Sequence, residues 1–153
     1  MPTTPATLAA TALGLDFEAT QHDGPIRSLA EAAAARGIDP HDLVKTLVVR
    51  RGTDDYLFLL VPGDGTFSWR KLRTLLGVSR LSLPDADTAR DVTGYVRGTI
   101  TPLGATTAWP VIADASIVGR RISVGGGAAG VGITVDADAL IEALHADIAD
   151  LMD

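Results

Sequence analysis

The chain has 153 residues, of which 13 are basic and 19 are acidic, so its formal net charge is −6. It contains no cysteine, which excludes disulfide frameworks, thiolate zinc sites and a cysteine nucleophile. Apolar residues make up 46% of the chain but form no run long enough to span a bilayer, so we expect one globular domain, residues 1–153, in the cytoplasm.

The first half of the chain predicts helices around a β-hairpin. An Ala- and Leu-rich stretch favours a short helix, and Ser28 with Glu31 forms a capping-box pattern that opens a second one. Two apolar runs separated by Gly52 and polar residues are typical of a hairpin. The predicted elements are helices over 5–15, Ser28–Arg36 and Ser68–Leu76, and strands over Thr46–Arg51 and Tyr56–Val61.

The second half predicts short strands broken by Gly and Pro. The expected elements are strands over Ser79–Leu83, Tyr95–Val96, Trp109–Ala113, Arg120–Val124 and Gly132–Val135, a helix over Asp85–Val92, and a last helix from Asp136. Leu140, Leu144, Ile148 and Leu151 fall on one face of that last helix. Helices interleaved with short strands and a hairpin favour an α/β fold with a mixed sheet over a regular βαβ array.

The charges are unevenly distributed along the chain. Residues 136–153 hold six acids and no base, while residues 65–83 hold four bases and no acid. The acidic total argues against sequence-blind binding of nucleic acid, but this basic segment does not. Eleven of the basic residues are arginines, and the two lysines are Lys45 and Lys71.

A glycine-rich segment over residues 125–130 fits the G-x-G-x-x-G pattern of dinucleotide-binding proteins. A strand-like sequence follows it, where that motif requires a helix, so we do not expect a dinucleotide site. The segment is either a permissive turn between strands or a loop whose backbone N–H groups approach a ligand. Residues 94–104, with three glycines and a proline, are either a turn or a wall that a substrate touches.

Two further residues carry open alternatives. Lys45 begins an apolar strand, where a lysine either extends to water or places an ammonium at the mouth of a pocket. His22 precedes Asp23-Gly24 and is either a surface-loop residue or a site residue. The three histidines are not spaced as metal ligands, so we expect neither a metal nor a cofactor.

The ordered set Val44–Val49, Thr93–Gly104, Asp114 and Val124–Gly126 resembles the YbaK/EbsC family, the aminoacyl-tRNA editing domain that is also associated with prolyl-tRNA synthetase. The resemblance covers about residues 20–150. It implies a mixed, partly barrel-like sheet flanked by helices. It also implies hydrolysis in trans of a mischarged tRNA, mainly tRNA for proline that carries cysteine, alanine or another small amino acid.

The same resemblance implies the roles of individual residues. Lys45 matches the family's functional lysine, Gly98 its pocket glycine, and Asp114 a recurrent aspartate with a supporting role. The expected substrate-binding residues are His22, Thr46, Gly98, Thr99, Pro102, Asp114, Gly125 and Gly126. The partners it implies are the acceptor end of an aminoacyl-tRNA and a prolyl-tRNA synthetase.

One position departs from the family pattern. Relatives often carry serine or histidine where this chain has Gly125, which leaves open a second function, a module that binds tRNA ends or a nucleotide without chemistry. We further expect Arg70, Lys71 and Arg73 to face the tRNA and the acidic C-terminal segment to face away from it.

Overall fold

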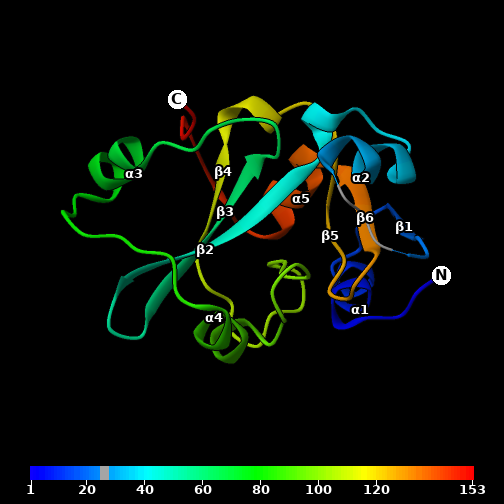
Figure 1. Ribbon diagram of the computed structural model, residues 1–153, viewed down its shortest axis with the longest axis horizontal. Coiled ribbons are helices and arrows are strands. Elements are labelled where there is room, and N and C mark those ends of the chain that lie inside the picture. Colours follow the sequence, from blue (N-terminus) through cyan, green and yellow to red (C-terminus); the bar gives the residue numbers. More distant parts are fainter. Residues whose placement is uncertain (25–27) are drawn as a thin grey trace.

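The computed structural model describes residues 1–24 and 28–153, which form two β-sheets flanked by helices (Figure 1). The strands are β1 (Phe17–Gln21), β2 (Val44–Gly52), β3 (Asp55–Pro62), β4 (Val111–Asp114), β5 (Arg121–Gly125), β6 (Val131–Asp136) and β7 (Asp147–Ala149). The helices are α1 (Pro5–Ala12), α2 (Leu29–Arg36), α3 (Trp69–Leu76), α4 (Ala86–Thr93) and α5 (Ala137–Ala143), with short 3-10 turns η1 (Pro40–Asp42) and η2 (Ala115–Ile117).

The larger sheet has the strand order β2-β3-β4-β7 and is mixed. The hairpin β2–β3 is antiparallel, whereas β3–β4 and β4–β7 are parallel. Strand β2 is therefore an edge of this sheet, and its outer side is available to other groups. The smaller sheet, β1-β6-β5, is antiparallel throughout.

The two sheets meet at one point, a parallel bridge between Leu43 and Ser123 that joins the start of β2 to β5. The two sheets and their helices confirm the predicted mixed α/β fold. The sheets do not close into a full barrel, in agreement with a sheet that is only partly barrel-like. The main core lies between the sheets and includes fully buried Phe58, Ile122 and Ile133. A second cluster covers the other face of the larger sheet, where Leu72 of α3 packs with Leu151.

Local signals at helix ends are confirmed. The hydroxyls of Ser28 and Ser68 accept backbone N–H groups three residues ahead, as N-caps do. Gly37, Gly77 and Gly94 end α2, α3 and α4 with positive φ angles, which glycine adopts without a Cβ penalty. The antiparallel hairpin β2–β3 forms where the sequence predicts it.

The prediction of one terminal helix is wrong in its second half. Helix α5 ends at Ala143, His145 turns the chain with φ 52°, and the following residues form β7 beside β4. Ile148 is therefore 52% exposed whereas Leu151 is fully buried, although a helix would place both on one face. The parallel pairing with β4 overrides the helical spacing.

Two other predicted strands are also wrong. Segment 79–83 makes a single bridge, Arg50 with Ser82, and is otherwise irregular. Residues 95–96 lie in a loop in which the Tyr95 hydroxyl donates to the carbonyl oxygen of Leu103 at 2.6 Å, so the backbone bends back instead of pairing.

Candidate functional site

A cleft of about 460 Å³ opens beside the first half of β2, and we call it the Lys45 cleft. Its size is that of a site for a small ligand. It brings together four of the predicted site residues, Lys45, Thr46, Gly98 and Gly125. The other lining residues are Leu29, Arg36, Leu43, Val44, Leu47, Arg97 and Ile100.

The cleft has a basic lining. Arg36, Lys45 and Arg97 contribute cations, and the described residues that line the cleft include no carboxylate. Lys45 lies exposed on β2 and forms no ion pair within residues 1–24 and 28–153. The cleft therefore suits a ligand with anionic or strongly polar oxygen atoms, and it offers no side chain that could act as a carboxylate general base.

The edge of β2 adds main-chain groups to the cleft. Arg50 exchanges backbone hydrogen bonds with Ser82 on the side away from β3, at 2.8 and 3.1 Å, and the register with β3 is regular from Val44 to Arg50. Because bonding direction alternates along an antiparallel strand, the N–H and C=O groups of Thr46 and Val48 also point away from β3. Among the described residues no backbone partner meets them there.

Two buried donors in the cleft have no partner within the described part of the chain, the Thr46 hydroxyl and Nε of Arg36. Nη1 of Arg36 donates to the Ser123 hydroxyl at 3.1 Å, which fixes the guanidinium, and burial lowers the pKa of Arg36 from its ordinary value. A buried donor without a partner is costly, so these two atoms favour a bound oxygen.

Gly98 and Gly125 come from two segments that line the cleft, the 94–104 loop and the end of β5. Gly98 has φ 90°, a conformation that suits glycine, and a Cβ there would meet nothing within 4 Å. At Gly125 a Cβ would lie 2.9 Å from the carbonyl oxygen of Ile100. The close approach of Ile100 thus favours glycine at position 125.

The other predicted substrate contacts do not line this cleft. The Thr99 hydroxyl donates to the Val96 carbonyl at 2.7 Å, and Pro102 lies in the turn that follows. His22 donates its backbone N–H to Gly130, at the far end of the glycine loop. Gly126 accepts the Thr4 hydroxyl at 2.6 Å, which ties α1 to that loop. The loop itself joins β5 to β6, so a strand follows it, as predicted.

Asp114 is buried at the end of β4, outside the Lys45 cleft. One carboxylate oxygen accepts the backbone N–H and the hydroxyl of Ser116, and the other accepts the backbone N–H of Leu151 at 2.8 Å. These hydrogen bonds hold η2 and the C-terminal segment together, and a role of Asp114 in substrate binding stays a prediction.

The predicted tRNA-facing residues lie on α3, and one expectation about them is wrong. Lys71 donates to Asp150 at 2.9 Å and to the Met152 carbonyl at 2.5 Å. The end of the acidic C-terminal segment, residues 150–153, thus lies against α3 instead of facing away. Arg70 and Arg73 have no ion pair within the described ranges.

Two features are absent from residues 1–24 and 28–153. No helix there is long and apolar enough to cross a membrane. No group of three or more histidine, aspartate or glutamate side chains is placed to hold a metal ion.

The fold and the basic cleft define a small mixed α/β domain with one edge strand open to a polar ligand. The family model of the aminoacyl-tRNA editing domain matches residues 23–143, so the chain belongs to this family, and the resemblance seen in the sequence is confirmed. The proline–tRNA ligase of Syntrophotalea carbinolica is 31% identical over 120 residues, 76% of this chain and 21% of the ligase. That of Thermosipho melanesiensis is 28% identical over 106 residues, 69% of this chain and 18% of the ligase. The chain spans about a fifth of the length of these curated relatives.

Solved structures agree on the fold over the whole chain. Hypothetical protein APE2540 superposes with a TM-score of 0.87 at 26% identity and covers 97% of this chain and 99% of its own. A protein described as a candidate trans-editing enzyme for prolyl-tRNA synthetase has a TM-score of 0.89 at 24% identity, with 100% of this chain and 99% of its own covered.

Sequence reasoning missed Arg36 and Arg97 as cleft residues. Arg97 adjoins Gly98, and the irregular stretch that contains both could have indicated it. Arg36 ends α2, where an arginine usually faces solvent and the helix C-terminus. A Cβ on Gly132 would lie 2.4 Å from Nε of Arg36, so this glycine makes room for the guanidinium, a relation that spans 96 positions of sequence.

Proposed function

We propose that this chain hydrolyses in trans the ester of a mischarged aminoacyl-tRNA. The substrate is tRNA for proline that carries cysteine, alanine or another small amino acid. The observation that carries the proposal is the Lys45 cleft, in which Lys45, Gly98 and Gly125 surround one small basic space beside an open strand edge. Membership of the editing-domain family supports the same reaction class.

The cleft residues divide the work between binding and charge stabilisation. A water molecule attacks the ester carbonyl, the bond to the ribose oxygen breaks, and the ribose leaves as an alcohol. The Lys45 ammonium binds oxygen atoms at the adenosine end or on the aminoacyl group. The outward N–H groups of β2 are donors that can stabilise the oxyanion.

Activation of the water falls to the substrate. Since no carboxylate or histidine is found among the described residues that line the cleft, the neighbouring ribose hydroxyl positions the water, as the family's substrate-assisted mechanism holds. The outward carbonyl oxygens of β2 can accept hydrogen bonds from the α-ammonium group of the amino acid.

The test is deacylation of a panel of mischarged tRNAs by the wild type, Lys45→Ala and Lys45→Arg, with Arg121→Gln as a surface control in the other sheet. Loss of the ammonium should lower the rate by about 10²-fold, and arginine should not restore it because a guanidinium is a larger, planar cation. No activity on any member of the panel would refute the function. Binding of the acceptor end that is lost in Lys45→Ala, without ester hydrolysis, would instead identify the non-catalytic module. Repeating the panel with a prolyl-tRNA synthetase present tests that partner.

A further inference from the structure

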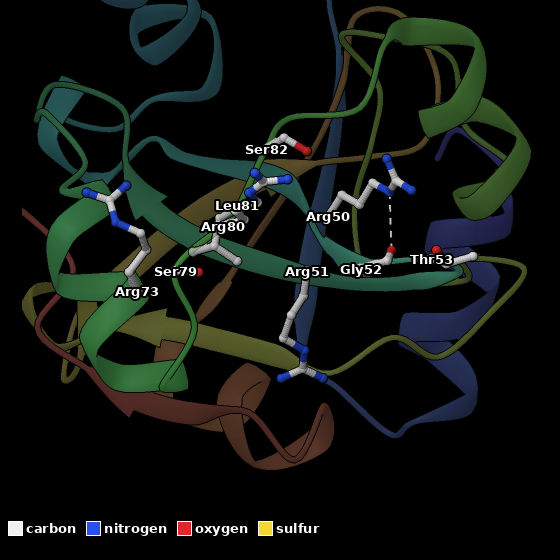
Figure 2. A pocket seen from close by; sticks show the side chains of 9 residues that line it. All are labelled: Arg50, Arg51, Gly52, Thr53, Arg73, Ser79, Arg80, Leu81 and Ser82. Carbon is white, nitrogen blue, oxygen red and sulfur yellow. Dashed lines mark hydrogen bonds between the residues drawn. The ribbon is translucent and has the colours of Figure 1, made fainter.

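A second cleft, of about 500 Å³, lies at the other end of β2, between the β2–β3 hairpin and the segment after α3. Figure 2 shows the side chains that line it, which come from both segments. Four of them are arginines, Arg50, Arg51, Arg73 and Arg80, and the lining contains no carboxylate. The cleft is therefore the site of a dense positive charge in a chain whose net charge is −6.

Three of these arginines are free to bind an anion. Arg51 donates to Asp55 at 2.9 and 3.1 Å, and in Figure 2 it points to the opposite side of the strand from Arg50. Arg50, Arg73 and Arg80 form no ion pair within residues 1–24 and 28–153. We call the space lined by these three residues the arginine cleft.

The arginine cleft has the donor chemistry of a phosphate site. Nε of Arg50 donates to the Gly52 carbonyl at 3.2 Å, which orients the side chain and leaves its two terminal nitrogens for a ligand. Guanidinium groups bind phosphate oxygens in pairs. The exposed hydroxyls of Ser79 and Ser82 add further donors in the same lining. Uncompensated like charges repel one another, and a bound polyanion relieves that repulsion.

The two clefts lie along the same edge of β2, and a third hollow, which Asp85 also lines, lies between them. This hollow shares Thr46 and Leu47 with the Lys45 cleft and extends to Leu83, the neighbour of Ser82 in the arginine cleft. From Lys45 to Arg50 the strand rises about 17 Å, at roughly 3.3 Å per residue. A strand of stacked nucleotides with about 3.4 Å per phosphate covers that distance in roughly five nucleotides.

We propose that the arginine cleft binds backbone phosphates of an RNA whose 3′ end occupies the Lys45 cleft. The identity of that RNA as a tRNA rests on the proposed function. The phosphates are those where the unpaired acceptor end joins the stem. This proposal adds Arg50 and Arg80 to Arg73 as RNA-binding residues. The RNA-binding surface then runs along the β2 edge instead of being confined to α3.

The experiment measures binding of three unacylated RNAs between 50 and 200 mM salt: a tRNA for proline, a stem-loop copy of its acceptor stem, and the trinucleotide CCA. The proteins are the wild type, the triple variant Arg50→Gln/Arg73→Gln/Arg80→Gln, the same triple change to lysine, and Arg51→Gln as the matched control. Far-UV circular dichroism and the Tm check that each variant is folded.

For the tRNA and the stem-loop, each lost phosphate contact should lower the slope of log Kd against log salt by about 0.7–0.9. The slope for the triple glutamine variant should therefore be lower than that of the wild type by about two to three. The lysine triple keeps most of the slope, and Arg51→Gln keeps all of it. Binding of CCA should not change in any variant, because it ends before the arginine cleft.

An unchanged slope and affinity in the glutamine triple would overturn the proposal, as would an equal loss of CCA binding. Binding of polyglutamate through the three arginines, without binding of RNA, would show a protein partner instead. Because these probes carry no amino acid, absence of ester hydrolysis would refute the proposed function alone and leave the result on RNA binding intact.

Discussion

The approach of Ile100 to Gly125 predicts that this glycine cannot be replaced without moving the wall of the Lys45 cleft. In Gly125→Ala the new Cβ would lie 2.9 Å from the Ile100 carbonyl oxygen, whereas ordinary contacts begin at 3.4 Å. The loop must therefore move by about 0.5 Å, the difference between the two distances. Overpacking of this kind costs about 1–3 kcal/mol, which corresponds to a fall in Tm of roughly 2–12 °C.

Gly52→Ala is the matched control, because Gly52 also ends a strand but its Cβ would meet only the Asp55 Cβ at 3.9 Å. Its Tm should stay equal or rise slightly, since alanine restricts the unfolded chain. Thermal unfolding is measured by circular dichroism, and KM for a mischarged tRNA by deacylation. If Gly125→Ala were as stable as the wild type with an unchanged KM, the close approach of Ile100 would be refuted.

Two further predictions concern the 94–104 segment. Gly98→Ala and Gly119→Ala each place a Cβ at positive φ in open space, so the free energy of unfolding in urea should fall by about 1–2 kcal/mol in both variants. Only Gly98→Ala should slow deacylation. Equal deacylation rates in the two variants would contradict a role for Gly98 in the cleft. Burial raises the pKa of Tyr95 to about 12, so its contribution to stability is complete below pH 10 and is lost as pH rises through 12. Tyr95→Phe should therefore be less stable by about 1–3 kcal/mol at pH 8 and converge on the wild type at high pH, and parallel pH profiles would count against this.

Elements whose signals lie within a few residues were predictable. Ser68 and Gly77 mark both ends of α3 by capping chemistry alone. Strand β7 was not predictable, because it exists only through pairing with β4, where Ala113 lies opposite Ile148. The leucine spacing after Asp136 fits a helix equally well over a short range, and tertiary pairing decides between the two.

The candidate site shows the same division between local and distant relations. Lys45 and Gly98 could be proposed because each resembles a family position, and Gly125 because it begins the glycine-rich segment; the cleft brings all three together. Arg36 carries no motif, and its burial depends on the absence of a side chain at Gly132 on another element. No pattern near Arg36 in the sequence reports that absence.

The net charge of −6 is a poor guide to RNA binding here, because charges are neutralised unevenly. Lys71 is paired with Asp150, so the acidic C-terminal segment takes up a cation on the basic helix itself. Arg50, Arg73 and Arg80 keep their charges along one cleft. At physiological salt exposed charges more than about 8 Å apart are largely screened, so a phosphate at that cleft responds to the arginines around it and not to the total. An acidic chain can in this way present two locally cationic clefts along β2, with Asp85 in the hollow between them.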